Sequence, residues 1–280
     1  MHMKKKLIAA CAVLVGLLCV WGILDTMSKK RIATVEYTLE STKIAAPVRL
    51  LIAADLHNAR FGANQGELMD AIAAAAPDAV LLCGDLFHKD GPDDETLAFL
   101  KLVGKEYPCF YVTGNHEYRK GNGSANALCD EARACGITVL RGRSALFTAA
   151  NGQTVQLLGV DWQKVYDPKK GELAAIAKQR RGDLYAVALV HEPTQHRAVL
   201  SLGFDLMVSG HTHGGQWRVP GLLNGVYAPG QGLFPRFAGG SYEVGGKRLV
   251  VSRGLSKQPA CIPRFNNPPE LTLVTLLPAA

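Results

Sequence analysis

The sequence lacks the cysteine pattern of a small disulfide-bonded protein. Its 280 residues include seven cysteines, two of them in an apolar segment near the N-terminus. Cys83 and Cys109 lie in or beside expected strands, where cysteine usually acts as a small buried hydrophobe. Cys129 and Cys135 are close enough in sequence to pair if oxidised, but their spacing leaves this open. A disulfide framework is therefore not expected.

Repeats, low-complexity linkers and a basic patch interleaved with aromatic residues are also absent. The formal net charge is +7, and the basic residues cluster only at residues 4–6, 29–31 and 180–181. The first two clusters flank an apolar segment, which is typical of membrane-interface charges rather than of a nucleic-acid-binding surface. We therefore expect one domain, over residues 48–278, that is monomeric and binds no nucleic acid.

Residues 1–31 are expected to form a membrane anchor or a signal segment. Residues 7–24 carry no charge, and as a helix they would be about 27 Å long, close to the thickness of a bilayer core. A cleaved signal peptide is the alternative, but the run is long for one and ends without a small-residue cleavage site. We expect a single-pass protein of the cell membrane with its catalytic domain outside the cytoplasm.

From residue 48 the pattern alternates short β-rich runs with helical stretches, which predicts an α/β fold with parallel strands and outer helices. Beyond residue 217 the runs become shorter and rich in glycine and proline, which favours added antiparallel strands. The expected strands are 48–55, 78–85, 109–115, 137–140, 154–161, 184–192, 204–211, 242–254 and 270–277, and the expected helices are 66–77, 93–105, 124–136, 169–182 and 193–203.

Five of these strands end in residues that can bind a metal ion. In open α/β sheets, sites form at the carboxyl ends of strands. Each residue taken alone has an ordinary structural explanation, such as a turn, a cap or a core histidine. Five of the eight histidines fall at these ends, however, and that coincidence favours a metal centre. The candidate ligands are Asp55, His57, Asp85, Asn115, His191, His211 and His213.

The composition of this set indicates two metal ions rather than one. Mixed carboxylate, amide and imidazole ligands without cysteine suit Mn²⁺, Fe²⁺ or Zn²⁺ in a reactive site. Seven ligands are too many for one ion. Two ions that share a carboxylate, ~3.5–4 Å apart, could activate a hydroxide and stabilise charge on a phosphoryl group. His116, beside Asn115, could then donate a proton to the leaving oxygen.

The motifs D-x-H, G-D, G-N-H-E, H and G-H-x-H, in this order, resemble those of the calcineurin-like metallophosphoesterase superfamily. The resemblance implies a four-layer α/β/β/α sandwich of two mixed sheets with helices outside. It also implies that Asp85 bridges two ions, and that His116 is the catalytic histidine. One ion would have Asp55, His57, Asp85 and His213 as ligands, and the other Asp85, Asn115, His191 and His211.

The form "GHTHGGQ" and the N-terminal apolar segment resemble the bacterial branch of membrane-attached phosphodiesterases. That branch includes enzymes similar to UDP-2,3-diacylglucosamine pyrophosphatases, which implies a phosphodiester or pyrophosphate substrate that is lipid-linked or located in the cell envelope. The chain departs from the usual pattern at His88, where many relatives have an aspartate. In some family members that aspartate supports the catalytic histidine. Here Asp90 could take over this role, or His116 could lack such support. Glu192 stands where asparagine is more usual. A phosphomonoesterase, or a membrane-tethered module without turnover, are the alternative functions.

Overall fold

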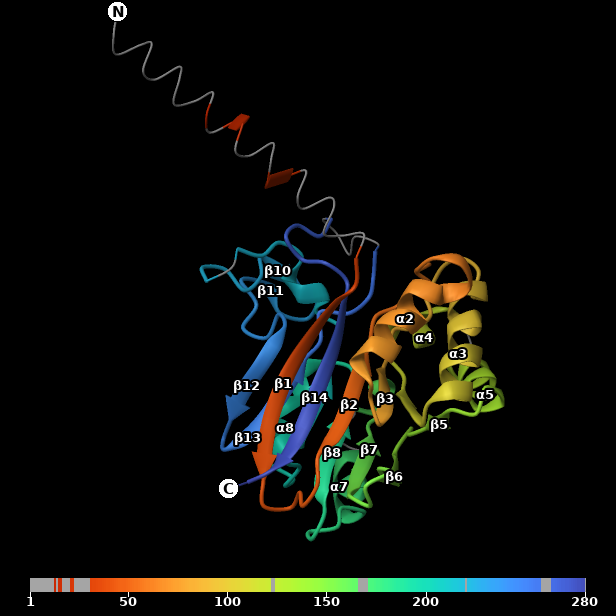
Figure 1. Cartoon of the computed structure of the whole chain (residues 1–280), viewed down its shortest axis with the longest axis vertical. Helices are drawn as coiled ribbons and strands as arrows, with labels where there is room; N and C mark the ends of the chain where they lie inside the picture. The colour runs from red at the N-terminus through yellow and green to blue at the C-terminus, as the bar shows by residue number, and fades with distance from the viewer. Residues whose placement is uncertain are drawn as a thin grey trace, which may run out of the picture.

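The computed structural model describes residues 13, 15–16, 21–22, 31–121, 124–165, 171–219, 221–257 and 263–279. Two six-stranded sheets and one two-stranded sheet account for its strands (Figure 1). In spatial order, the first sheet contains β1 (Ala33–Ser41), β14 (Glu270–Pro278), β2 (Val48–Ala53), β3 (Ala79–Cys83), β4 (Cys109–Val112) and β5 (Thr138–Val139). The second contains β12 (Gly240–Val244), β13 (Lys247–Val251), β9 (Leu206–Ser209), β8 (Tyr185–Leu189), β7 (Thr154–Gly159) and β6 (Arg143–Thr148).

Both six-stranded sheets are mixed. The pairs β2–β3, β3–β4 and β4–β5 are parallel, as are β7–β8, β8–β9 and β9–β13. Antiparallel pairs join β14 to β2, β12 to β13 and β6 to β7. The third sheet is a hairpin of β10 (Tyr227–Ala228) and β11 (Gly232–Leu233). Of the strands after residue 217, β12 and β14 make the antiparallel pairs that the sequence pattern favours, whereas β13 pairs in parallel with β9.

Alternate residues of each strand face different layers. Leu50 and Ile52 of β2 join a core with β8 residues such as Val187, so this core lies between the two sheets. Leu51 and Ala53, which alternate with them, pack instead with helices on the outer face of the first sheet. Because successive side chains of a strand point to opposite faces, a strand buried on both faces reads as a continuous apolar run.

Helices cover the outer faces of both sheets. α2 (Gly66–Ala75), α3 (Asp94–Glu106) and α5 (Ser124–Ala134) pack on the first sheet, and α7 (Glu172–Lys178) and α8 (His196–Leu200) pack on the second. The short elements are α4 (Asn115–Arg119), α6 (Trp162–Val165), and the 3-10 turns η1 (Ala63–Gln65), η3 (Pro193–Gln195) and η4 (His213–Gly215). The predicted four-layer sandwich is confirmed.

The sequence did not predict β1, β6 or α4. β1 pairs in parallel with β14 at the edge of the first sheet, so this sheet includes residues before 48, where the domain was expected to begin. The side chains of β1 alternate between half-buried and exposed, which is typical of an edge strand and produces no apolar run. Cys129 and Cys135 are both free thiols.

The predicted anchor, residues 1–31, lies almost wholly outside the described residues. Within the part of the chain that the structure describes, no helix has both the length and the apolar character needed to cross a bilayer. The anchor therefore stays a prediction from the sequence.

Candidate metal centre

The loops that follow β2 and β3 are held together by backbone hydrogen bonds. The Asp55 N–H donates to the Gly84 carbonyl at 3.0 Å, and the His57 N–H donates to the Asp85 carbonyl at 3.1 Å. Across the sandwich, the His211 N–H donates to the Asp55 carboxylate at 2.9 Å. The strand ends of the two sheets therefore meet at one place, and all seven predicted ligands are buried there.

Two groups of three side chains can each hold one ion. The ligand atoms of Asp55, His57 and His213 lie within 4.8 Å of one another, and so do those of Asp85, His191 and His211. The same distance limit also groups His57 with His88 and His116.

Asp85 contacts both of the first two groups. Its Oδ2 lies 3.3 Å from His191 Nε2 and 3.7 Å from His57 Nε2. His191 Nδ1 donates to the Cys83 carbonyl at 2.8 Å, so Nε2 is left to face Asp85 and lies 3.1 Å from His211 Nδ1. Asp85 therefore lies between two groups of possible ligands, and the assignment of each group to one ion stays a prediction.

Burial keeps most of these imidazoles neutral. It lowers the pKa of His57 and of His211 to about 3, and that of His213 well below its usual value. Burial also disfavours protonated His191, but the adjacent Asp85 carboxylate outweighs it and raises the pKa to about 9. For Asp85, burial is likewise outweighed by the neighbouring imidazoles, and its pKa lies well below the usual range. Neutral imidazoles with free lone pairs are the form that binds metal.

Several of the polar atoms have no partner within the protein. Both ring nitrogens of His57, Nδ1 of His213 and Oδ1 of Asn115 are buried and accept or donate no hydrogen bond. Each such atom costs about 1–3 kcal/mol of stability. Metal coordination would satisfy these lone pairs, and the donor set is the one that borderline divalent ions prefer. The residues present therefore fit divalent metal ions.

The backbone at the ligands is strained. Asp55, His57, Asp85, His211 and His213 all have positive φ, between 48° and 70°. Left-handed backbone is uncommon for residues other than glycine, and clusters of it occur at functional sites. Gly114 shows how closely the chains pass, since a Cβ on it would lie 2.2 Å from Asp85 Oδ1.

His116 lies at the edge of the centre, on α4. Its Nδ1 accepts a hydrogen bond of 3.2 Å from the Lys89 N–H, so the ring proton is carried by Nε2. Nε2 lies 4.0 Å from Asp85 Oδ2. Asp90 does not support His116, because its carboxylate pairs with the Lys89 ammonium and its N–H donates to His88. The Lys89 backbone amide thus contacts the His116 ring, in the role that the sequence suggested for the Asp90 carboxylate.

Glu117 is a structural residue of the site that the sequence reasoning missed. Its buried carboxylate accepts four backbone N–H groups, two on each oxygen. Asp85 N–H (3.1 Å) and Gly114 N–H (2.8 Å) donate to Oε2, and Leu86 N–H (2.8 Å) and Phe87 N–H (3.3 Å) donate to Oε1. Glu117 therefore ties the loop after β3 to the start of α4. The glutamate is part of the motif G-N-H-E, but the neighbouring sequence does not show which groups its side chain contacts.

Glu192 contacts His211 from the other side. Its Oε1 lies 3.4 Å from His211 Nε2 and accepts a 3.0 Å hydrogen bond from the Trp162 indole N–H. Since His211 Nδ1 faces His191, the carboxylate holds the Nε2–H tautomer and leaves the Nδ1 lone pair free. A carboxylate behind a metal-binding histidine commonly orients the ring in this way.

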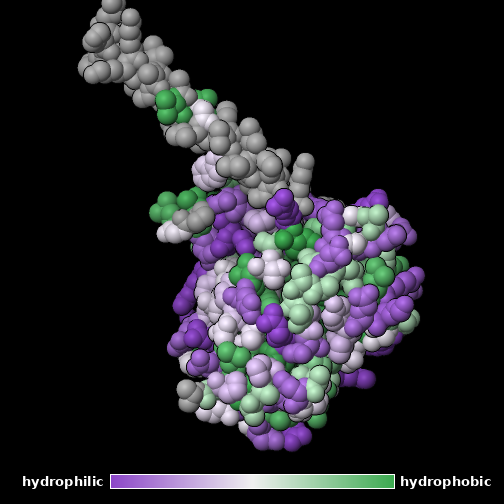
Figure 2. Space-filling model, viewed as in Figure 1, coloured by the Kyte–Doolittle hydropathy of each residue, from purple (hydrophilic) through white to green (hydrophobic). Residues whose placement is uncertain are grey.

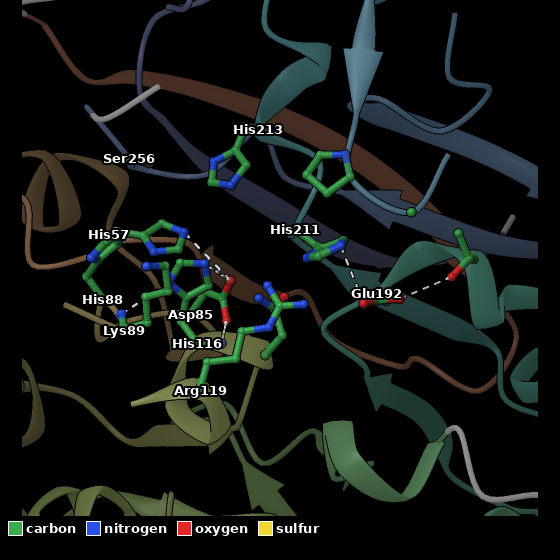
Figure 3. A pocket seen from close by; sticks show the side chains of 14 residues that line it. His57, Asp85, His88, Lys89, His116, Arg119, Glu192, His211, His213 and Ser256 are labelled. Carbon is green, nitrogen blue, oxygen red and sulfur yellow. Dashed lines mark hydrogen bonds and ion pairs between the residues drawn. The ribbon is translucent and has the colours of Figure 1, made fainter. Parts of the chain in front are cut away.

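A cavity of about 530 Å³ opens over these residues. Figure 3 shows His57, Asp85 and His116 on one side, His211 and Glu192 on the other, and Arg119 projecting between them. Lys89, His88, Thr194 and Ser256 also line the cavity, together with the hairpin residues Pro229 and Gly230. The walls therefore combine metal-binding groups with cationic side chains suited to a phosphate ester.

Comparison with known proteins identifies the class. The profile of the calcineurin-like phosphoesterase family matches residues 48–215. The chain belongs to this family of metallophosphoesterases, which are hydrolases that use divalent metal ions. The superfamily predicted from the motifs is thus confirmed.

The chain is similar to the phosphodiesterase YaeI of Escherichia coli K12, with 30% identity over 240 residues that cover 83% of each chain. It is 28% identical to the metallophosphoesterase YkuE of Bacillus subtilis over 211 residues, which are 73% of this chain and 70% of that one. Among solved structures, it is similar to a phosphopantetheinyl hydrolase from Mycobacterium tuberculosis. That match has 13% identity and a TM-score of 0.46, and it covers 74% of this chain and 89% of the other. The narrower resemblance to UDP-2,3-diacylglucosamine pyrophosphatases stays a prediction.

Proposed function

We propose that this protein is a two-metal phosphodiesterase or pyrophosphatase of the cell membrane, with a lipid-linked or cell-envelope substrate. The observation that carries the proposal is the pair of ligand groups on either side of Asp85. Either ion could be Mn²⁺, Fe²⁺ or Zn²⁺, because the donors are carboxylate, amide and imidazole groups. When bound, the ions would supply Lewis acidity toward the phosphoryl group and activation of water.

The two ions would have separate histidines and one shared carboxylate. Asp55, His57 and His213 would hold the first ion, and Asn115, His191 and His211 the second, with Asp85 serving both. Asn115 is assigned to the second set by the family resemblance, and its Oδ1 is buried without a partner, as a metal ligand would be before an ion binds.

His116 would provide the proton for the leaving oxygen. Its Nε2 carries the ring proton in the tautomer set by the Lys89 N–H, and the ring lines the cavity. A positioned general acid contributes typically ~10²–10⁴-fold in rate. Arg119, which lines the same cavity, would bind phosphate oxygens of the substrate.

One observation supports a diester or pyrophosphate over a monoester. The relative with 30% identity is named a phosphodiesterase. The sequence of residues 7–24 supports a location at the membrane, with the domain outside the cytoplasm. A phosphomonoesterase and a module without turnover remain the alternatives to be tested.

The test is hydrolysis of two chromogenic esters by the full chain in detergent, loaded with Mn²⁺. We expect bis-p-nitrophenyl phosphate to be hydrolysed faster than p-nitrophenyl phosphate, with loss of activity in EDTA. Preference for the monoester would contradict the diesterase assignment. If neither ester is hydrolysed in a metal-dependent way, the proposal that the protein is an enzyme is refuted. The variant His116→Ala should keep both ions and lose more activity on alkyl diesters, whose poor leaving groups need a proton, than on p-nitrophenyl diesters.

A further inference from the structure

Four large apolar side chains are exposed on one short part of the chain. Trp217 is 46% exposed, Leu222 83%, Leu233 68% and Phe234 70%. Among described residues from 31 onward, the other exposed large apolar side chain is Leu146, on β6. Figure 2 shows apolar atoms at the end of the molecule where β10 and β11 lie, beside hydrophilic ones. Several exposed apolar side chains on one segment are a signal of an interaction site.

Phe234 adds a second signal. Its φ is +52°, and its N–H donates to the Val226 carbonyl at 2.8 Å, so the hairpin holds it in this conformation. For a bulky residue, left-handed backbone is an outlier that costs stability. The ring is mostly exposed, so packing within the chain does not offset the cost of this backbone conformation. A contact between the ring and a group outside the chain would offset it.

The segment lies next to the predicted membrane anchor. The Trp217 ring lies 5.5 Å from the Phe265 ring, which in turn lies 4.9 Å from the ring of Trp21. Trp21 belongs to the uncharged run of residues 7–24. If that run enters a bilayer, the exposed apolar side chains would be close to the bilayer surface.

The same hairpin borders the metal centre. Pro229 and Gly230, in the turn between β10 and β11, line the cavity, while Leu233 and Phe234 follow at the end of β11. Arg236, two residues further on, is an exposed cation. Apolar side chains with adjacent cations match the acyl chains and anionic headgroups of a bilayer.

We propose that residues 217–219 and 221–236 form a lipid-contacting surface that seats the cavity opening against an anionic bilayer. The inference rests on the membrane location within the proposed function, but not on the reaction. It extends that function by explaining how a lipid-linked substrate would reach the metal centre. We favour a bilayer over a second copy of the chain, because the segment adjoins the 18-residue uncharged run and its own charged residues, Arg218 and Arg236, are both basic.

Trp217 itself can report on the contact. The full chain with Trp21→Phe would be bound to vesicles of phosphatidylethanolamine and phosphatidylglycerol with brominated acyl chains, which quench nearby tryptophans. We expect loss of Trp217 emission, measured as the difference from the Trp21→Phe, Trp217→Phe variant. Trp162 is present in both and donates its N–H to Glu192 in the site, so it cancels in the difference.

Serine replacements of the exposed apolar side chains on this segment test whether they hold Trp217 at the bilayer, and the same replacement of an exposed leucine elsewhere is the control. Leu222→Ser, Leu233→Ser and Phe234→Ser, made together in the Trp21→Phe background, should restore the Trp217 emission, whereas Leu146→Ser should not. All four side chains are exposed, so equal thermal midpoints are expected and are checked first.

Three results would overturn the proposal: no binding to the vesicles, unquenched Trp217 in the bound chain, or equal quenching after the triple replacement. A triple variant that loses a dimer in sedimentation while Trp217 was never quenched would assign the surface to self-association instead. No metal or substrate is added, so a chain that binds lipid in this way but hydrolyses no ester would refute the proposed reaction and leave the lipid contact standing.

Discussion

Replacing Glu117 with glutamine removes one carboxylate oxygen from the centre of the site while keeping the shape of the side chain. In the native chain each oxygen accepts two backbone N–H groups. The glutamine amide has one oxygen and one NH₂ group, and NH₂ can only donate. In either orientation, two buried N–H groups would face a donor. The two N–H groups that lose their acceptor are those of Asp85 and Gly114, or those of Leu86 and Phe87.

The size of the effect follows from this count. An unsatisfied buried N–H costs about 1–3 kcal/mol, so two of them reduce the free energy of unfolding by roughly 2–6 kcal/mol. Proteins have about 5–15 kcal/mol of stability in total, so the variant should fold but melt early. With about 2–4 °C per kcal/mol for a domain of this size, the midpoint should fall by roughly 4–24 °C. Metal affinity should fall as well, because the Asp85 backbone moves.

Thermal unfolding followed by circular dichroism, in EDTA, measures the first effect without contribution from bound metal. Glu131→Gln is the control, because Glu131 is an exposed glutamate on α5 and its replacement should leave the midpoint unchanged. A midpoint for Glu117→Gln that matches the control would refute the reasoning, since it would mean that the four N–H groups do not depend on the carboxylate.

The remaining predictions concern metal binding. The number of bound metal ions can be counted by elemental analysis. His211→Ala and His213→Ala should each retain one of two ions, while Asp85→Asn should bind both weakly. Loss of both ions in either histidine variant would argue against separate sites. Gly114→Ala should bind metal poorly in a titration, because its Cβ would lie 2.2 Å from Asp85 Oδ1, and native affinity there would contradict this packing. Glu192→Ala should weaken the binding of one ion by about 10–100-fold. Glu192→Gln should retain most of the affinity, because an amide oxygen at the Oε1 position can still face His211 Nε2. An equal loss in both variants would argue against a role for this contact.

The positions of the predicted ligands follow from the strand pattern. Each apolar run that ends in Asp55, Asp85, Asn115, His191 or His211 is a strand, and parallel strands of one sheet end at the same edge. The sequence could therefore predict that the first three residues meet in one sheet and the last two in the other. The meeting of the two sets depends on how the sheets pack. The sequence did not predict β1, whose apolar side chains alternate with polar ones and form no continuous run, or α4, which is too short to show a helical period.

Sequence reasoning missed Glu117 and gave Glu192 no role, because both act on the ligands from a distance along the chain. Glu117 receives N–H groups from a loop about 30 residues earlier, and Glu192 contacts a histidine 19 positions later. No local pattern encodes such a contact, because it depends on how two loops cross. The left-handed backbone at Asp55, Asp85 and His211 is of the same kind, since only the packed loops impose it. A dinuclear centre needs its ligands closer together than ordinary strand ends bring them. Positive φ at the ligands, glycine at Gly114 and the Glu117 carboxylate are three means to that end. Their cost in strain and buried polar atoms would be offset when metal binds.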